Sequence, residues 1–398
     1  MTAFLPLRNT PRDYAWGAVD GVSRALGWSE SGAAEAELWL GAHPLSPAVL
    51  EDAEWPDLAA WQDEAGVELP FLLKVLSARS ALSLQAHPTT AQAEAGFARE
   101  EAAGLPLTAR ERNYKDPNAK PELIVATEDG FEALCGFRDP AETIAALAVF
   151  GAVPGIERLL ERLWEGVEPA FAWLLSGDPE VATLVSAVVG RANAAAAPRA
   201  VPPVAPRAKR DETSRPATPD AELVTRLAAQ FPGDPGILIA LMLNHVTLAE
   251  GEALWLPAGN IHAYLRGTGL ELMGPSDNVL RGGLTPKHVD RAELQAVLDF
   301  TPGPPPRLVP VPVAPGIAAY RPASVPSGAD VGFELLLVTA DAGLDLPTAA
   351  IAIALEGAFD LTRDDETAEI DRGGILFLPE PGPLQVTGAG RLFVATGR

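Results

Sequence analysis

The sequence is poor in the residues that build disulfide frameworks and histidine-rich metal sites. Among 398 residues there is one cysteine, Cys135, which excludes an internal disulfide and fits a reducing cytoplasm. No apolar run approaches the roughly 18 residues of a membrane span, and Met1–Gly17 lacks the pattern of a signal peptide. Of five histidines none follows His288, so a histidine-based metal site cannot lie in the C-terminal part.

Positive charge is also scarce. The chain has 30 Lys and Arg against 53 Asp and Glu, a formal net charge of −23. Such a chain repels nucleic acid and anionic membrane surfaces, so we expect neither as a partner. It repels an anionic metabolite as well, so any phosphate site has to be a local basic patch.

The predicted secondary structure changes from strands to helices and back along the chain, and the length suggests two or three domains. Short strand-like runs occupy residues 1 to about 138. Asp139 and Pro140 then read as the N-cap and first residue of a helix. Two further helices are predicted, one with Ile156–Trp164 at helical spacing and one opening at Asp178.

A segment rich in alanine and proline, at about 191–219, reads as a surface insertion within this helical region. Strand-like patterns return near Gly251. A proline-rich connector follows Thr301, and short strands with glycine turns continue to the C-terminus.

The strongest local motif is GEALWLPAGNIH, Gly251–His262, which resembles the second cupin motif. Gly251 predicts a turn, the next residues a buried strand, and Pro257–Gly259 a tight turn. His262 is therefore expected to point inward from the following strand. Alone, such a histidine is more often a core or surface group than a metal ligand.

Two other segments supply donors. In LSLQAH, Ser83, Gln85 and His87 fall on one face if the chain is extended, although a plain polar strand face is about equally compatible. In NYKDPNAKPEL, Glu122 stands at the start of an apolar strand. Together with His262 these give two imidazoles, one carboxylate and one amide, a set of donors that suits zinc.

These segments, together with AELWLGAHP and SDNVLRGGLTPK, resemble type I mannose-6-phosphate isomerases from about Tyr14 to Phe300. The resemblance implies a mainly β fold with an α-helical insertion and two cupin domains, which are jelly-roll-like β-barrels. We expect a catalytic zinc cupin domain at residues 1–138 and 236–300, a helical insertion domain at 139–235, and a metal-free C-terminal cupin domain at 301–398.

The resemblance also implies a site and a reaction. Gln85, His87, Glu122 and His262 are expected to bind one Zn²⁺ per chain, and Arg281 to be an active-site arginine. The reaction expected is the interconversion of mannose 6-phosphate and fructose 6-phosphate through a cis-enediol(ate), in the cytoplasm, by a chain that is a monomer. The family form carries a histidine where this chain has Ala119, which weakens any mechanism that needs a histidine there.

The base that moves the proton between C1 and C2 stays open among Glu271, Asp277 and Lys120. Candidate substrate-binding residues, which wall the sugar site or anchor its phosphate, are Trp16, Lys74, Ser83, Tyr264 and Lys287. The histidines His43, His245 and His288 are expected to be structural or exposed.

Three alternatives differ in class. A cupin could sense a sugar phosphate without turning it over, or isomerise another aldose phosphate. An iron oxygenase would use two histidines and one carboxylate with open positions. The fourth donor Gln85 and the basic anchor favour the isomerase.

Overall fold

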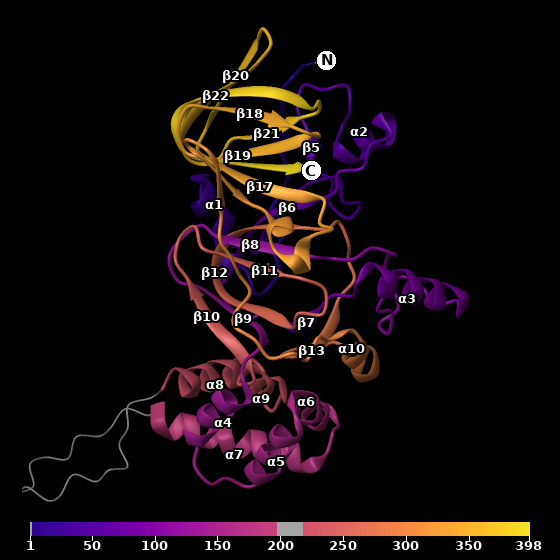
Figure 1. Cartoon of the computed structure of the whole chain (residues 1–398), viewed down its shortest axis with the longest axis vertical. Helices are drawn as coiled ribbons and strands as arrows, with labels where there is room; N and C mark the ends of the chain where they lie inside the picture. The colour runs from indigo at the N-terminus through magenta and orange to yellow at the C-terminus, as the bar shows by residue number, and fades with distance from the viewer. Residues whose placement is uncertain (1, 197–217) are drawn as a thin grey trace, which may run out of the picture.

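Three bodies follow one another along the longest axis of the molecule: a C-terminal group of strands, a central group of strands, and a group of helices (Figure 1). The computed structural model describes residues 2–196 and 218–398. Most of the alanine- and proline-rich segment predicted at about 191–219 lies outside the described residues. The chain is mainly β with helices, as expected. No helix among the described residues is long and apolar enough to cross a membrane.

The central body is organised around β12, which pairs with four other strands among the described residues. His262 pairs with both β7 and β9, the residues to Arg266 continue along β9, and the second half pairs with β6 from Gly267 and with β8 from Gly269. The strands of this body are β4 (Glu37–Leu40), β6 (Leu72–Ala78), β7 (Leu84–Ala86), β8 (Glu122–Ala126), β9 (Phe131–Phe137), β10 (Leu243–Leu248), β11 (Ala253–Leu256), β12 (His262–Met273), β13 (Leu280–Gly283) and β14 (Arg307–Leu308).

A sharp bend in β12 folds the central sheet back on itself. Glu122 is the register partner of Met273 at the end of β12, yet its carboxylate contacts His262 at the start of the same strand. Eleven extended residues would span about 36 Å, so the strand has to turn between them. It does so around Gly267, whose φ of 109° favours glycine, and a Cβ there would lie 2.7 Å from the Cα of Phe131.

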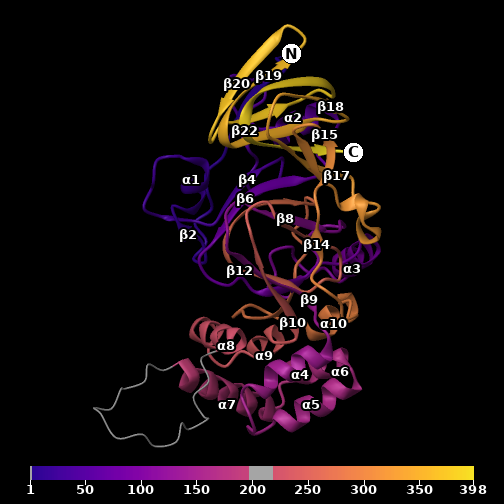
Figure 2. The ribbon, with the colours of Figure 1, turned by 60° about the vertical axis from the view of Figure 1, so that its left-hand side comes forward.

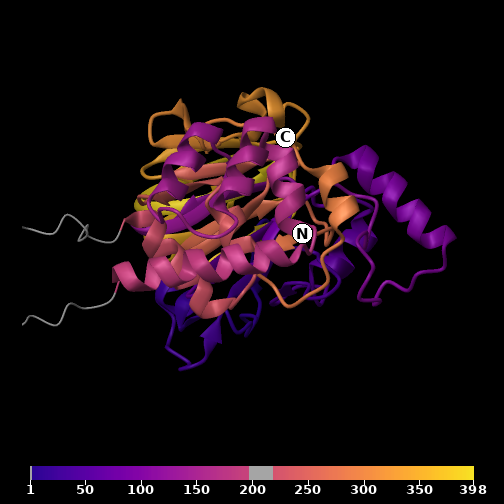
Figure 3. The same ribbon diagram turned by 90° about the horizontal axis from the view of Figure 1, so that it is seen from below.

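In the part of the chain that the structure describes, six helices lie between β9 and β10 in the sequence. They form a layer that covers one end of the central strands, as the view from below shows (Figure 3). They pack on the outward residues of the central strands, among them Leu84, Ala86, Ile261 and Ala263. This layer consists of α4 (Pro140–Ala148), α5 (Ile156–Glu165), α6 (Val167–Leu175), α7 (Pro179–Ala196), α8 (Pro219–Gln230) and α9 (Gly236–Ala240).

The helix signals of the sequence are confirmed in the main. Asp139 caps α4 through a bond from the Ala141 amide to its carboxylate, with Pro140 at the first position, and α7 begins at Pro179. Trp164, the last residue of the helical spacing noted in the sequence, lies at the surface of α5. Its side chain is 79% exposed, because Leu159 and Leu163 already fill the inner face of α5.

The C-terminal body is a second sheet system built around long β19 and β22, which pair from Ala350 to Thr362. Its strands are β15 (Val311–Ala314), β16 (Ile317–Tyr320), β17 (Phe333–Val338), β18 (Ala342–Leu346), β19 (Ala350–Arg363), β20 (Glu366–Asp371), β21 (Ile375–Leu378) and β22 (Gly382–Gly397). The N-terminal strand β1 (Leu5–Arg8) joins this sheet through β21 and carries β5 (Val49–Leu50) on its other edge.

Shorter elements fill the flanks, and α1 and β2 lie beside the junction of the two strand bodies (Figure 2). They are β2 (Ala18–Val19), β3 (Ala34–Glu35), α1 (Gly21–Leu26), α2 (Leu58–Ala65), α3 (Thr90–Ala102), α10 (Arg291–Val297) and the 3-10 turns Pro322–Ser324 and Pro326–Gly328.

A buried carboxylate links the helical layer to the central strands. Glu132 of β9 is 6% exposed and forms ion pairs with Arg226 of α8, Arg266 of β12 and His245 of β10. Burial alone would raise the pKa of Glu132, but these partners, His245 first, lower it to about 2.

We expect Glu132→Gln to lower stability at neutral pH by about 1–3 kcal/mol, because two arginines lose their shared partner but stay partly exposed. The folded pKa lies below the unfolded value of about 4.3, so the stabilisation is present above that value and is lost as the pH falls through the folded pKa. Melting temperatures of the two proteins should therefore converge in acid. Glu165→Gln, at an exposed pair with Arg162, is the control and should change little at any pH.

Candidate metal centre

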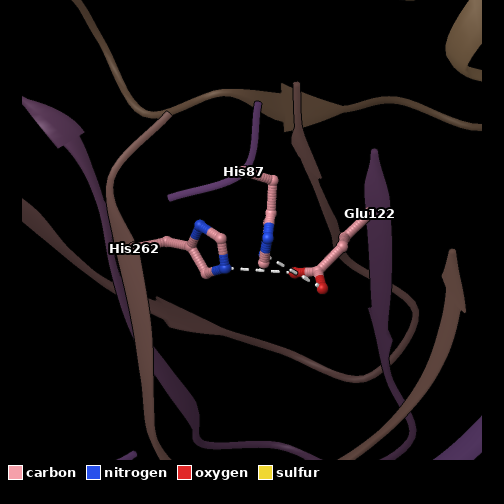
Figure 4. Close-up of side chains that lie close together, drawn as sticks. All are labelled: His87, Glu122 and His262. Atoms are coloured by element: carbon pink, nitrogen blue, oxygen red, sulfur yellow. Dashed lines mark ion pairs between the residues drawn. The ribbon is translucent and has the colours of Figure 1, made fainter. Parts of the chain in front are cut away.

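Three inward-pointing side chains meet in the interior of the central body. His87 follows β7, Glu122 begins β8 and His262 begins β12, and the two rings approach the carboxylate from neighbouring directions (Figure 4). The Nε2 atom of His87 lies 3.3 Å from Oε1 of Glu122, and that of His262 lies 3.0 Å from Oε2. All three side chains are 1% exposed.

Strand alternation explains why these side chains point inward. Leu84 and Ala86 of β7 pack on the helices, as do Ile261 and Ala263 beside His262. The residues between them therefore face the opposite side of the sheet. Gln85 is one of these, and its amide nitrogen is placed 3.3 Å from Nε2 of His262. The predicted shared face of Gln85 and His87 is thus present.

Both histidine rings are held by main-chain carbonyls on the side away from the cluster. Nδ1 of His87 lies 2.7 Å from the oxygen of Asn278, and Nδ1 of His262 lies 3.0 Å from the oxygen of Asn260. A carbonyl only accepts, so Nδ1 carries the proton and donates. Each Nε2 therefore presents its lone pair to the space shared with Glu122, which is the usual orientation of metal-binding histidine.

The donors fit a small divalent metal ion. Nε2 of His87 and Oε2 of Glu122 are buried without a hydrogen-bond partner, and one donor atom from each of the three residues can lie within 4.8 Å of the others. Donors of one tetrahedral zinc ion lie roughly 3.3 Å apart. Burial lowers the pKa of His87 to about 4, which keeps its ring neutral. Burial would raise the pKa of Glu122, but the charge of Lys120 holds it well below its usual range.

A second polar group lies across the interior from the cluster. Lys74 of β6 pairs with Glu271 of β12 at 3.2 Å and with Glu37 of β4 at 3.6 Å, and its ammonium group lies 4.9 Å from the ring centre of Trp39. Burial would lower the pKa of Lys74, but Glu37 and Glu271 raise it above its ordinary value. Burial raises the pKa of Glu271. The hydroxyl of Tyr264, beside Phe131, is buried without a hydrogen-bond partner.

Arg281 lies in one row with the cluster. Its position in β13 is the register partner of Gln85, which is the register partner of His262. Cross-strand partners point to the same side, so Arg281 faces the cluster from two strand spacings away, roughly 10 Å. Within the described residues the guanidinium has no carboxylate partner. Burial lowers the pKa of Arg281. Partial desolvation and the charge of Arg281 lower the pKa of Lys287, although most of Lys287 is exposed.

The remaining predicted site residues differ in burial and in contacts. Lys120 lies against the cluster itself, 2.9 Å from Oε1 of Glu122. Asp277 is partly exposed and faces His43. Trp16 is half-buried and packs with the interior group that includes Tyr264. Ser83 precedes β7 and is half-buried.

His43, which was expected to be structural or exposed, is a buried histidine that contacts one of the candidate bases. It is 7% exposed, packs edge-on against Trp39 and has its Nε2 3.3 Å from the carboxylate of Asp277. It lies in the AELWLGAHP segment, so its place in that motif was the available signal. Asn278, whose carbonyl holds His87, was also missed although it lies within SDNVLRGG.

A buried cluster of two histidines and one carboxylate in a strand scaffold could hold a single metal ion. A family profile described as phosphomannose isomerase type I, catalytic domain, matches residues 4–140. The chain is 35% identical to mannose-6-phosphate isomerase of Salmonella typhimurium and 36% identical to that of Escherichia coli, each over 97% of both chains. A crystal structure of mannose 6-phosphate isomerase bound with zinc and yttrium superposes with a TM-score of 0.81 at 32% identity, covering all of both chains. The chain therefore belongs to the type I phosphomannose isomerase family, a family of enzymes.

Metal loading should stabilise the fold, because the donors are preformed in the folded state and scattered in the unfolded one. We expect the melting temperature of metal-free protein to rise by several degrees with a slight excess of a divalent transition metal. Glu122→Gln should lose most of this rise, since the only carboxylate of the cluster is gone. An unchanged rise in that variant would place the metal elsewhere. Glu165→Gln is again the control.

Proposed function

We propose that this chain is a zinc-dependent aldose–ketose isomerase that interconverts mannose 6-phosphate and fructose 6-phosphate in the cytoplasm. One observation carries the proposal. A buried donor cluster and an arginine without a carboxylate partner in the described residues share one face of one sheet. In a chain of net charge −23, a local cationic group beside a metal site suits a small anionic substrate: the arginine can bind its negative charge and the metal can polarise its oxygens.

We propose the domain division predicted from the sequence, with a catalytic cupin at 1–138 and 236–300, a helical insertion at 139–235 and a C-terminal cupin at 301–398. The bend of β12, which closes the central strands around the cluster, supports the first cupin. The first residues depart from the division, since β1 pairs with β21.

Zinc suits the donor set best. Two imidazoles and a carboxylate, with the amide of Gln85 as fourth donor, are typical borderline ligands. The amide of Gln85 can turn so that its oxygen instead of its nitrogen faces the cluster. When bound, zinc would act as a Lewis acid on the C1 and C2 oxygens. A relative's crystal structure is described as bound with zinc.

The chain's own residues would orient the substrate around this centre. Arg281 can meet the phosphate or the developing enediolate with a planar pair of N–H donors, and Lys287 lies close enough to add charge. Tyr264 offers an unpartnered hydroxyl on the same strand face as His262. Trp16 would wall the sugar.

The geometry ranks the three candidate bases. Lys120 is held against Glu122, Glu271 is paired with Lys74, and both side chains are buried. Asp277 is the one with a partly exposed carboxylate. Although burial would raise the pKa of Asp277, His43 keeps it below its usual range. We propose Asp277 as the base, with Lys120 as a proton donor on the opposite oxygen.

The alternatives fit less well. A two-histidine, one-carboxylate oxygenase would leave Arg281 and Lys287 without a role. A sensor without turnover would not need a base such as Asp277. An isomerase for another aldose phosphate shares every feature and differs only in substrate.

The deciding experiment is a coupled assay of fructose 6-phosphate formation from mannose 6-phosphate, before and after chelation. We expect turnover that chelator abolishes and zinc restores, with about one zinc per chain by elemental analysis. Full activity in chelator with no bound metal would refute the zinc proposal. Binding without turnover would favour the sensor, and faster turnover of a different aldose phosphate would change the substrate.

Arg281→Ala should lower kcat by on the order of a hundredfold, because the guanidinium meets charge that grows as the enediolate forms. Zinc content should be unchanged. Arg281→Lys should recover little, since a point charge cannot replace the paired donors. A raised KM at nearly normal kcat would instead make Arg281 a ground-state phosphate anchor. Arg162→Ala, on the surface of α5, is the control.

A further inference from the structure

Two loops beside the metal centre are joined by buried polar side chains. One loop, residues 115–121, leads into Glu122. The other, residues 274–279, leads from β12 to β13 and Arg281. Asp116, Ser276 and Asn278 connect them, and we call these three side chains the loop clamp. None of the three has a role in the proposed reaction.

Asn278 is the centre of the loop clamp. It is fully buried, at 0% exposure. Its Oδ1 accepts a bond from the Lys115 amide at 2.6 Å, and its Nδ2 donates to the carbonyls of Asp116 at 2.8 Å and Asn118 at 2.9 Å. The amide thus uses both its acceptor and its donor sides on the opposite loop.

Asp116 and Ser276 complete the clamp from the other direction. Asp116 accepts from the Ser276 hydroxyl at 2.8 Å and from the main-chain amide of Asp277 at 2.9 Å. The Ser276 hydroxyl oxygen accepts from the main-chain N–H of Asn278 at 3.2 Å. The loops also touch directly at Gly274, where a Cβ would lie 2.9 Å from the carbonyl oxygen of Ala119.

The main chain that the clamp holds is the part that orients His87. The Asn278 carbonyl accepts from Nδ1 of His87 at 2.7 Å, which fixes the tautomer and the ring direction. The opposite loop contains Lys120 and leads directly into Glu122, the first residue of β8. The clamp therefore fixes the relative position of two donors that belong to different strands.

We propose that Asn278 is a positioning residue of the metal centre, which acts through its own carbonyl on His87 and through the clamped loop on Glu122. This inference rests on the proposed metal function. It assigns to the clamp an effect on metal affinity beyond its contribution to stability. Outer-shell partners of this kind typically change metal affinity or activity by about 10- to 100-fold when they are replaced.

The test compares zinc affinity in three variants of the full chain with the wild type. Asn278→Asp keeps the shape and the acceptor but replaces the Nδ2 donor by an oxygen that faces two carbonyls. Ser276→Ala removes a milder part of the clamp. Asn9→Ala is the control, because its amide also donates to two main-chain carbonyls, of Trp39 and Ser46, away from the cluster.

Zinc dissociation constants are measured by competition with a chromophoric chelator, on protein whose fold is verified by circular dichroism below its melting temperature. We expect zinc binding to weaken at least tenfold in Asn278→Asp, less in Ser276→Ala, and less than threefold in Asn9→Ala. The visible spectrum of cobalt-loaded protein should shift in Asn278→Asp, because the donor geometry changes. If Asn278→Asp does not fold, a threefold or larger loss in Ser276→Ala carries the proposal.

Three results would separate the possibilities. Unchanged zinc affinity in the folded clamp variants would overturn the positioning role, even if activity fell. An equal loss in Asn9→Ala would also overturn it, since any loss of loop packing would then suffice. A wild type that binds no zinc would refute the proposed metal function itself.

Discussion

The bend in β12 is the constraint on which the site depends. Glu122 is paired with Met273 at the end of β12. Because the strand bends, the Glu122 side chain also contacts His262 at its beginning. Without the turn near Gly267 the two donors would lie at opposite ends of an extended strand. Steric fit enforces this position, because Phe131 packs where a side chain would stand. The helical layer then seals the outer face opposite Gln85 and His262.

The charges around the cluster differ in their exposure. Arg281 is half-buried and Lys287 is exposed, whereas the donor cluster and the Lys74–Glu271–Glu37 group are buried. The carboxylates of Glu122, Glu271 and Glu37 each have a cationic or histidine partner, which offsets much of the cost of leaving water. Arg281 departs from this pattern among the described residues. An arginine that the fold leaves without a carboxylate in so acidic a chain is available to a ligand.

The local patterns of the sequence predicted much of the site, because alternation along a strand is a local property. Gln85 and His87 on one face, the turn at Gly251 and the capped start of α4 all followed from spacing alone. The pattern could not say which side chains a neighbouring element covers. Trp164 follows the helical spacing of α5 and is nevertheless exposed, because Leu159 and Leu163 already fill the inner face. The contact between His43 and Asp277 could not be predicted for the same reason, since the two residues are far apart in the chain. The pairing of β1 with β21 has no local signature either.

That last pairing ties the beginning of the chain to its end. Leu5 lies opposite Phe377, so the strand made first during synthesis has to wait for nearly the whole chain before its partner exists. Contacts of such long sequence separation close late and slowly. The edge of β1 is meanwhile open, and β5 on its other side belongs to the same early segment. The C-terminal sheet is consequently assembled from both ends of the polypeptide, and a chain cut near residue 301 would yield two fragments that each lack a strand the other holds.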